Sequence, residues 1–483
     1  MRGWSAEQVA AAAGGTLVRG GAGSPKRVVI DSREVGSGDF FVGLPGERAD
    51  GGSFAAGALE AGAWGVLVAS AWARDLPGEG AVIAVEDPVT ALGALAQAWR
   101  RELGADVIAV TGSVGKTSTK DLIAALIAPH RAVIASPANY NTEIGLPLAV
   151  LGAPAGTEVL VLEMGMRGFG QIAELTAIAE PDVGVVTAIG PVHVEQVGSL
   201  EGVAQAKGEL LVALRDGATA VVPAGEERLD PWLRSELLVV TFGPGGDVEL
   251  EPRGPHAVST EASSAGRPRT SAAYTIRAGD ERVELELPFS SAHNLRNTLA
   301  AVAAARAVGV RPEGRVEVRF GALRGEHVQL PGGAVVINDC YNANPLSMRA
   351  ALDDLSLQEP ARRRVAVLGD MLELGADERE HHRQIGAYAA GSRVDVLVTV
   401  GPLAAEMGAR FEGEVHAVAD AAAAARLARE LLQPGDVVLV KVSRGVGLEV
   451  VAEALSRGSA PTPGRPNDPR GAAGRPTDPR GAG

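Results

Sequence analysis

The sequence predicts an α/β protein of three domains, with a doubly wound, mostly parallel sheet in the central one. Two observations favour this class. Short apolar runs alternate with helical stretches along most of the chain, as in strand–helix–strand crossover units. The chain also has 483 residues, too many for one hydrophobic core, and a length that corresponds to about three domains.

The first region, residues 1–104, is expected to form a small α/β domain. Its apolar runs are short and separated by turn residues, which is typical of strands. A helical stretch at about 89–103 follows them. The predicted strands are 28–30, 39–42, 65–68 and 81–85.

The second region, residues 105–313, is expected to hold the doubly wound sheet. Its apolar runs resemble parallel strands buried on both faces, with helical segments between them. Residues 241–290 are rich in Gly, Ser and Thr with alternating Val and Glu, which indicates an antiparallel edge or a hairpin insertion. An alanine-rich helix is predicted at 293–308. The predicted parallel strands are 107–110, 158–162, 183–187 and 218–222.

The third region, residues 314–457, is expected to be another α/β domain, with an alanine-dense helix at 420–432. Residues 464–483 are a tandem ten-residue repeat without apolar residues, so we predict that 458–483 form a disordered tail. The predicted strands of the third domain are 334–338, 364–368, 395–400 and 436–441.

Composition describes an ordinary soluble globular protein, with 46% hydrophobic and 22% charged residues. The net charge of −14 and the lack of a basic stripe argue against nucleic acid as a partner. The single cysteine, Cys340, excludes an intrachain disulfide. No secretory signal is recognisable, and no apolar stretch is long enough to span a membrane. We therefore expect a cytoplasmic protein.

The strongest functional signal is a glycine-bearing loop within 105–122, between a predicted strand and a predicted helix. Loop N–H groups and the positive end of the helix together bind phosphate, while Lys116 would add charge and Thr117 a hydroxyl for Mg²⁺. Val110 stands where the common Walker pattern has its first glycine, so the loop is a tighter variant. The alternative, a glycine turn that happens to hold a lysine, does not explain why strand, loop and helix agree. The sequence predicts ATP binding by Thr111, Gly112, Ser113, Val114, Gly115, Lys116, Thr117 and Ser118.

Three further residues in the second region are candidates for the same site. Glu163 ends a predicted parallel strand at the ligand-binding edge of the sheet and is a natural Mg²⁺ ligand, although it could instead be a helix cap or a surface acid. His193 follows another strand end, where a simple turn residue is the alternative. Lys207 lies on a predicted helix, where a solvated lysine is the plain interpretation.

The long alanine helix and the third region add four more candidates. Asn294 and Asn297 are three residues apart on one helical face and could contact a purine edge, or they could be helix caps. Arg324 could stabilise the charge of a transferring phosphoryl group. Asp339, at the end of a predicted strand, could hold ribose hydroxyls.

In this order, TGSVGKTST (111–119), Glu163, His193, Lys207, HNLRN (293–297) and DCYNANP (339–345) resemble the Mur ligase family. The match covers about residues 27–457. The resemblance implies an N-terminal α/β domain that binds UDP-N-acetylmuramic acid, a central P-loop ATPase domain and a C-terminal Rossmann-like ligase domain. It also implies ATP and Mg²⁺ as cofactors.

Within the family, three segments look like the branch that adds D-alanyl-D-alanine to UDP-N-acetylmuramoyl-tripeptide: DCYNANPLSM (339–348), LGDMLELG (368–375) and NYNTEIGLP (139–147). The N-terminal run DSR (31–33) with GDFFVGLPG (38–46) is similar to the family's uridine-nucleotide domain. KVSR (441–444) resembles the family's Lys-Gly-Ser-Arg element. The resemblance implies that this chain binds these two substrates, and we expect a monomer.

The resemblance also implies a role for each matching residue. Lys116 would contact phosphates, Asn294 adenine, Arg324 the γ-phosphate and Asp339 ribose, with Asn297 beside the nucleotide. The Mg²⁺ ligands would be Thr117, Glu163, His193 and, if carbamoylated, Lys207. The catalytic group would be Lys116, Arg324, His193 and Lys207, and the residues expected to bind substrate are Ser32, Arg33, Asn139, Asn141, Asn342 and Asn344.

The chain departs from the family pattern at three places. It has Leu323-Arg324 where Gly-Arg is usual, Asn141-Thr142 where Asn-Asn is usual, and Val442 where Gly is usual. These departures bear on Arg324 and on the substrate residues rather than on the phosphate loop.

The implied reaction begins with attack of the tripeptide carboxylate on the γ-phosphate of ATP, and the acyl phosphate formed is then captured by the dipeptide amine. Because water would destroy the acyl phosphate, we expect the third domain to close over the second. The alternatives are a sibling ligase with another acceptor, including a folylpolyglutamate-type ligase, and a non-catalytic nucleotide-binding regulator.

Overall fold

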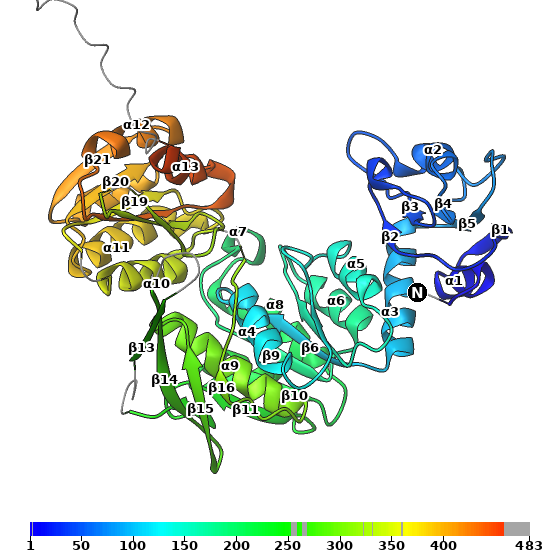
Figure 1. The fold of residues 1–483 in the computed structure, drawn as a ribbon, viewed down its shortest axis with the longest axis horizontal. Helices are drawn as coiled ribbons and strands as arrows, with labels where there is room; N and C mark the ends of the chain where they lie inside the picture. Colours follow the sequence, from blue (N-terminus) through cyan, green and yellow to red (C-terminus); the bar gives the residue numbers. More distant parts are fainter. Residues whose placement is uncertain are drawn as a thin grey trace, which may run out of the picture.

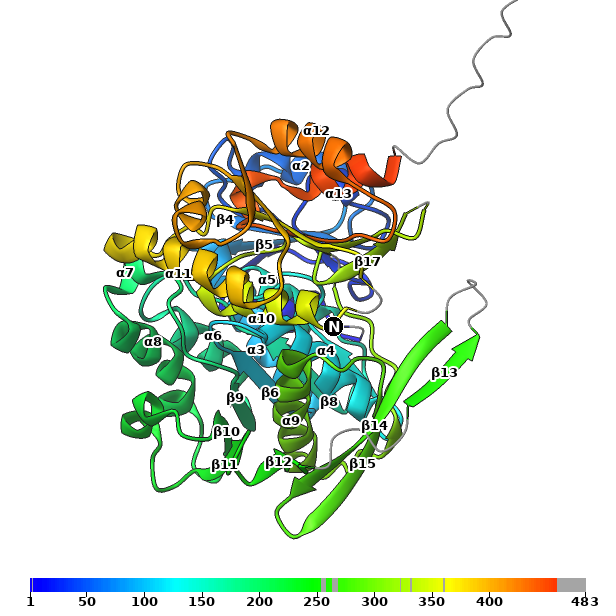
Figure 2. The same ribbon diagram turned by 90° about the vertical axis from the view of Figure 1, so that its left-hand side faces the viewer.

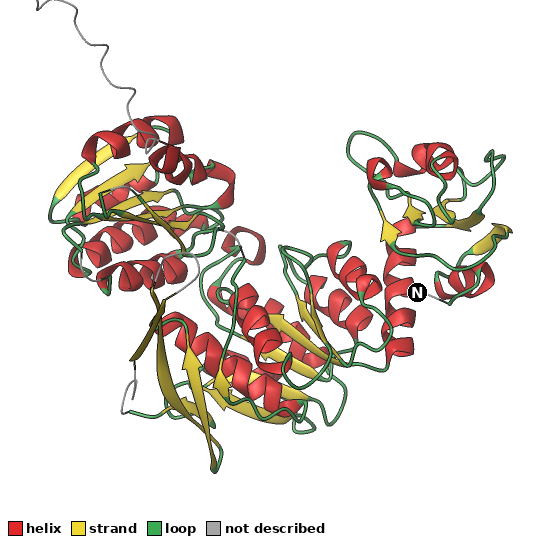
Figure 3. Ribbon diagram, in the orientation of Figure 1, coloured by secondary structure: helices red, strands yellow, loops and turns green. Residues whose placement is uncertain are grey.

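The computed structural model describes residues 1, 3–252, 258–262, 268–321, 323–330, 332–358 and 361–457. The predicted tail, 458–483, lies outside these residues. The described chain forms three sheets with helices packed on them, which confirms the predicted α/β class (Figure 3). In Figure 1 the N-terminal and C-terminal units lie at opposite ends of the molecule, with the central unit between and below them.

The N-terminal unit is a five-stranded sheet in the order β1-β5-β4-β3-β2. Its four last strands run parallel, and β1 pairs antiparallel with β5. The four predicted strands are all present, and β1 was missed because it is short and half exposed. The elements are α1 (Ala6–Ala12), β1 (Thr16–Arg19), β2 (Val28–Val29), β3 (Phe40–Val42), α2 (Ala55–Glu60), β4 (Gly65–Ala69) and β5 (Ala81–Val85).

Helix α3 (Pro88–Leu103) joins the N-terminal unit to the central one. Asp87 caps its first turn by accepting hydrogen bonds from two backbone N–H groups. The helix packs on α5 (Gly145–Gly152) and α6 (Gln171–Ala179), and the Trp99 indole donates to the Ala153 carbonyl at 3.0 Å. The last helix of the predicted first domain therefore shares a hydrophobic core with the second, and Figure 1 shows it beside α5 and α6.

The central unit contains an eleven-stranded sheet among the described residues, in the order β16-β15-β14-β12-β11-β10-β9-β6-β8-β7, with β13 paired to β14. The strands from β7 to β12 run parallel, which confirms the doubly wound arrangement. The predicted strands correspond to β6, β8, β9 and β10. The bounds are β6 (Asp106–Thr111), β7 (Val133–Ala135), β8 (Val159–Glu163), β9 (Val183–Val186), β10 (Thr219–Pro223), β11 (Leu238–Phe242) and β12 (Val248–Leu250).

The antiparallel insertion predicted within 241–290 is also present. β12, β14 and β15 pair antiparallel, and β14 with β15 forms a long hairpin (Figure 2). Two-residue β16 then pairs with β15, so the central sheet continues as far as residue 315. The bounds are β13 (Val258–Ala262), β14 (Pro268–Ala278), β15 (Glu281–Leu287) and β16 (Gly314–Arg315).

The predicted alanine helix is α9 (Ala292–Ala307), which packs beside α4 (Lys116–Ile127) on the central sheet; α4 lies against β6, β7 and β8, and α9 against β9 to β12. All of its residues from 297 to 305 are buried. Alanine is suited to this place because a methyl side chain lets two helices and a sheet approach closely. The other central helices are α7 (Val194–Val197) and α8 (Leu200–Ala213).

The C-terminal unit is a six-stranded sheet in the order β17-β18-β22-β19-β20-β21, with only β17 antiparallel to its neighbour. All four predicted strands are present, as β18, β19, β20 and β22. The elements are β17 (Glu326–Gln329), β18 (Val335–Asp339), α10 (Pro345–Ser356), β19 (Arg364–Gly369), α11 (Glu378–Gly391), β20 (Val396–Val400), β21 (Glu414–Val418), α12 (Ala421–Leu431), β22 (Val437–Lys441) and α13 (Glu449–Arg457).

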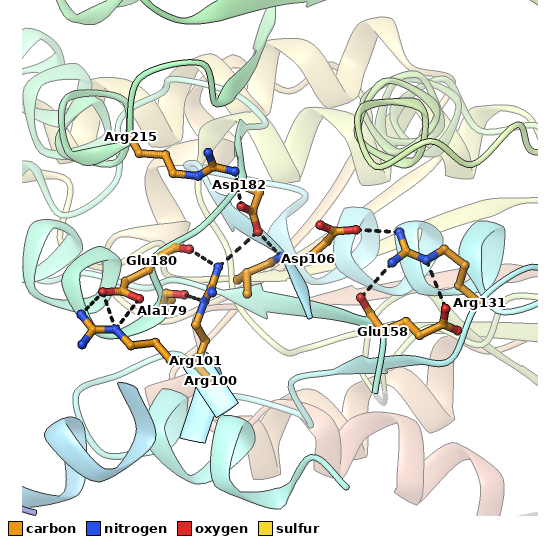
Figure 4. A network of polar contacts seen from close by, with 10 residues as sticks. Arg100, Arg101, Asp106, Arg131, Glu158, Ala179, Glu180, Asp182 and Arg215 are labelled. Atoms are coloured by element: carbon orange, nitrogen blue, oxygen red, sulfur yellow. Dashed lines mark hydrogen bonds and ion pairs between the residues drawn. The ribbon is translucent and has the colours of Figure 1, made fainter. Parts of the chain in front are cut away.

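A polar network fixes α3 to the start of the central strands (Figure 4). Asp182, just before β9, accepts a 2.8 Å hydrogen bond from the Val107 N–H and pairs with Arg100 of α3 at 3.3 Å and with Arg215 at 2.6 Å. Its side chain is only 18% exposed, so its charge is poorly solvated and depends on these partners. Asp182 thus joins a helix, two strands and the end of α8.

We predict that Asp182→Ala lowers the free energy of unfolding by about 1.5–3 kcal/mol, because it removes a charged acceptor of three hydrogen bonds. The matched control is Asp216→Ala. Asp216 is 75% exposed and pairs with Arg234, so its loss should change the free energy by less than about 0.5 kcal/mol. Urea denaturation followed by circular dichroism measures both, and equal effects would contradict the prediction.

Candidate functional site

A cavity of about 1620 Å³ lies between the central and C-terminal units. Loops at the carboxyl ends of β6, β8 and β9 line it on the central side, and loops after β18, β19 and β22 line it on the other. In open α/β sheets, ligands bind at this edge, at the point where strand order reverses. β6 lies at such a point, because the next strands along the chain, β7 and β8, lie on one side of it and the following ones, β9 and β10, lie on the other.

The predicted phosphate loop connects β6 to α4 and lines this cavity. Gly112 and Gly115 have φ angles of +143° and +85°, and an added Cβ would lie 2.0 Å from Thr187 Oγ1 and 2.5 Å from Asn297 Oδ1, respectively. Only glycine fits at these two positions. No side chain caps the start of α4, so its first N–H groups are available to an anion.

Glu163 is held among polar groups at the end of β8. The Thr117 hydroxyl donates to its Oε2 at 2.6 Å, and the Asn141 amide donates to its Oε1 at 2.9 Å. Its backbone N–H donates to Ser136 Oγ. The hydroxyl and the carboxylate, both predicted to bind Mg²⁺, therefore lie together at the cavity, and hard cations prefer such oxygen ligands.

Two lysines lie near this pair. Lys116 lines the cavity, and its ammonium donates to the Gly112 carbonyl at 2.8 Å. Lys207, on α8, is fully buried, and its ammonium takes part in no hydrogen bond or ion pair among the described residues. Burial, reinforced by the charge of Lys116, lowers the pKa of Lys207 well below its usual value. A buried amine without a partner is costly unless it is neutral or modified.

His193 contacts the C-terminal unit across the cavity. Its Nδ1 lies 2.5 Å from Oε2 of Glu373, which follows β19. Burial lowers the pKa of His193, while the Glu373 carboxylate acts in the opposite direction. Glu373 was quoted in the sequence only as part of a motif and was not predicted as a site residue.

The predicted nucleotide residues of α9 also reach the phosphate loop. Asn297 is 9% exposed. Its side-chain oxygen lies so close to Gly115 that a Cβ at that glycine would come within 2.5 Å of it. Asn294 lies one turn earlier, with its side-chain oxygen 3.4 Å from the Asn297 amide nitrogen, and both line the cavity.

Arg324 and Asp339 line the cavity from the C-terminal side. The Arg324 guanidinium stacks on the Tyr341 ring, 3.6 Å from its centroid, and Arg444 lies 5.4 Å from the same ring. Asp339 forms an ion pair with Lys441 at 2.6 Å. Tyr341 and Lys441, like Glu373, were not predicted as site residues. The signals available for Lys441 were its place at the end of a predicted strand and in the KVSR segment.

The predicted substrate residues fall into two groups. Asn139, Asn141, Asn342 and Asn344 line the cavity, but Asn344 also caps α10 and donates to the Ser113 carbonyl at 3.4 Å, so it joins the two units. Ser32 and Arg33 belong to the N-terminal unit and are not part of the cavity lining; Arg33 pairs with Asp31 at 2.5 Å. The structure does not bring these two groups together.

The described residues contain no group of three or more His, Cys, Asp or Glu side chains arranged for a metal ion. The predicted Mg²⁺ set has only one carboxylate and one histidine, so it relies on the Thr117 hydroxyl and on modification of Lys207. None of the described helices is long and apolar enough to cross a membrane.

Comparison with known proteins agrees with this architecture. Family models named Mur ligase family catalytic domain, Mur ligase middle domain and Mur ligase glutamate ligase domain match residues 26–100, 110–305 and 323–444. The UDP-N-acetylmuramoyl-tripeptide--D-alanyl-D-alanine ligase of Bacillus subtilis (strain 168) is 36% identical over 443 residues, which cover 89% of this chain and 92% of the relative.

Two solved structures are similar over nearly the whole length. MurF from Acinetobacter baumannii has a TM-score of 0.80 and 28% identity, covering 94% of this chain and 99% of its own. MurF ligase from Thermotoga maritima, solved in complex with ADP, has a TM-score of 0.74 and 29% identity, covering 89% and 97%. Family models over all three units and a relative matched along most of its length show that this chain belongs to the Mur ligase family.

Proposed function

We propose that this protein is an ATP-dependent ligase that joins D-alanyl-D-alanine to the terminal carboxylate of UDP-N-acetylmuramoyl-tripeptide, in peptidoglycan precursor synthesis in the cytoplasm. The observation that carries the proposal is the Thr117–Glu163 pair, 2.6 Å apart beside a phosphate loop, at a cavity that a second α/β unit lines. The relatives' names supply the substrates.

ATP binds with its phosphates at the loop before α4 and its adenine toward Asn294 and Asn297. The supporting features are the space-restricted glycines, the uncapped helix start and the ADP complex of the Thermotoga maritima relative. Asp339 lies on the opposite wall and is the candidate for the ribose hydroxyls.

Thr117 and Glu163 would hold Mg²⁺, together with His193 and a carbamate on Lys207. Their hard oxygen atoms suit this ion, and burial favours the neutral imidazole that a metal ligand needs. When bound, Mg²⁺ supplies positive charge for the triphosphate and for the transferring phosphoryl group. The unpartnered, buried Lys207 fits a modified side chain better than a free ammonium.

In the reaction, an oxygen of the tripeptide carboxylate attacks the γ-phosphorus and ADP leaves, which gives an acyl phosphate. The amine of the dipeptide then attacks the acyl carbon, and phosphate leaves from the tetrahedral intermediate. Lys116 and Arg324, which both line the cavity, neutralise charge on the transferring group.

The N-terminal unit holds the UDP-sugar end of the substrate, where Ser32 and Arg33 are the candidates for contact. Asn139, Asn141, Asn342 and Asn344 would contact the peptide parts near the phosphate loop. Because the N-terminal unit stands apart from the C-terminal one (Figure 1), the substrate would reach the cavity in an extended form. Closure of the C-terminal unit would exclude water from the acyl phosphate.

We predict that Lys116→Met abolishes ligation, with at least about a 100-fold loss of D-alanyl-D-alanine-dependent phosphate release, because a charge on the transferring group is no longer neutralised. Lys116→Arg, which keeps the charge, is the matched variant and should retain more activity. Circular dichroism checks that both are folded. Full activity of the folded methionine variant would refute the role of Lys116.

We predict a carbamate on Lys207. Burial lowers the pKa of Lys207 and so favours its neutral amine, which is the form that reacts with CO₂. In ¹³C-bicarbonate, the wild type should show a carbamate resonance by ¹³C NMR that Lys207→Ala lacks, and removal of bicarbonate should lower activity. A wild-type spectrum identical to that of the alanine variant would rule the modification out.

We predict that, among candidate acceptors, D-alanyl-D-alanine alone stimulates ADP formation strongly in the presence of UDP-N-acetylmuramoyl-tripeptide. The panel contains diaminopimelate, lysine and glutamate as the acceptors of sibling and folate-type ligases. Stimulation by one of these would identify a sibling activity. Slow turnover that no acceptor changes would favour a nucleotide-binding regulator instead.

A further inference from the structure

The contact between His193 and Glu373 joins two units that are far apart in the sequence. His193 immediately precedes α7 in the central unit, and Glu373 lies between β19 and α11 in the C-terminal unit. The side chains meet at 2.5 Å, and the Val194 N–H donates to the Glu373 carbonyl at 3.1 Å. The contact therefore involves both a side chain and the backbone.

Both residues have unusual backbone conformations. The φ angles of His193 and Glu373 are +54° and +63°, in the left-handed region that residues with side chains rarely adopt. Such conformations persist where the surrounding structure fixes them, and they occur often at functional sites. Here the two residues that contact each other across the cavity share the feature.

The loop that carries Glu373 is fixed by partners from three different elements. The Met371 N–H donates to Nε2 of the fully buried His382 on α11 at 3.0 Å. The Leu372 N–H donates to Ser443 Oγ, after β22, at 3.0 Å. With the bond from Val194, three consecutive residues of the loop are held, so the position of the Glu373 carboxylate is set by the fold.

The contact also determines which nitrogen of His193 is free. An ionised carboxylate only accepts hydrogen bonds, so this contact places the proton on Nδ1, and in the neutral imidazole the lone pair is then on Nε2. Histidines that bind metals commonly donate their other ring N–H to a carboxylate or carbonyl, which fixes the ring orientation and the tautomer.

We propose that Glu373 is a positioning residue, which orients His193 so that Nε2 can bind the active-site metal ion. The inference rests on the proposed function, in which His193 is a metal ligand. The new element is that the carboxylate that orients His193, that of Glu373, comes from the C-terminal unit. The metal site in the central unit is therefore complete only when the C-terminal unit is docked against α7.

The test uses the full chain loaded with ADP and with Mn²⁺ in place of Mg²⁺. Pulsed electron paramagnetic resonance detects an imidazole nitrogen bound directly to Mn²⁺, and titration of free Mn²⁺ gives the affinity. The variants are Glu373→Ala, which removes the acceptor, and Glu373→Gln, which keeps an acceptor oxygen. Glu412→Gln, at an exposed glutamate of the same unit, is the matched control, and His193→Ala identifies the source of the nitrogen signal.

We expect the nitrogen signal in the wild type, in Glu373→Gln and in Glu412→Gln. Glu373→Ala should remain folded by thermal unfolding but should lose most of the signal and bind Mn²⁺ about 10- to 100-fold more weakly. An unchanged signal and affinity in Glu373→Ala would overturn the positioning role while leaving His193 as a ligand. Absence of the signal from the wild type would overturn both, because His193 would then not bind the metal.

Discussion

In a parallel sheet every strand ends at the same edge, and the candidate site depends on two such edges that meet at one cavity. On one side, β6, β8 and β9 bring the phosphate loop, Glu163 and the His193 loop together. On the other, β18, β22 and β19 bring Asp339, Lys441 and Glu373 together. Residues more than 200 positions apart, such as Ser113 and Asn344, are hydrogen-bonded as a result.

Local patterns were sufficient to predict the strands buried on both faces, because these strands are continuous apolar runs. They were also sufficient for the phosphate loop, because its residues are contiguous. Glu163 could be predicted because it ends such a run. Edge strands such as β21, whose residues are exposed or half-buried, lack a continuous apolar run and were not predicted. The partners of His193 and Asp339 could not be predicted, because Glu373 and Lys441 reach the site only through tertiary packing. The packing of α3 against α5 and α6 could not be predicted either, because it joins segments that are distant in the sequence.

Two departures from the family pattern have a structural context. Leu323 stands where glycine is usual and has a φ of +62°, a conformation that costs a non-glycine residue about 1–2 kcal/mol. Its carbonyl accepts a hydrogen bond from the Tyr341 N–H, and the next residue stacks on the Tyr341 ring. Val442 also replaces a glycine; it is fully buried, and a Cβ on Gly369 would lie 2.3 Å from it. Gly369 supplies the room that Val442 takes.

The small, buried side chains of α9 have a consequence for the position of the neighbouring helix α4. The buried small side chains of α9 let it pack closely beside α4, and the first turn of α4 is the predicted phosphate end. A bulkier residue at one of these positions would push α4 as a rigid rod and displace that turn. Nucleotide affinity should therefore depend on side-chain volume at positions of α9 that do not contact the nucleotide. Substitutions at these buried positions would be restricted even though they lie outside the site.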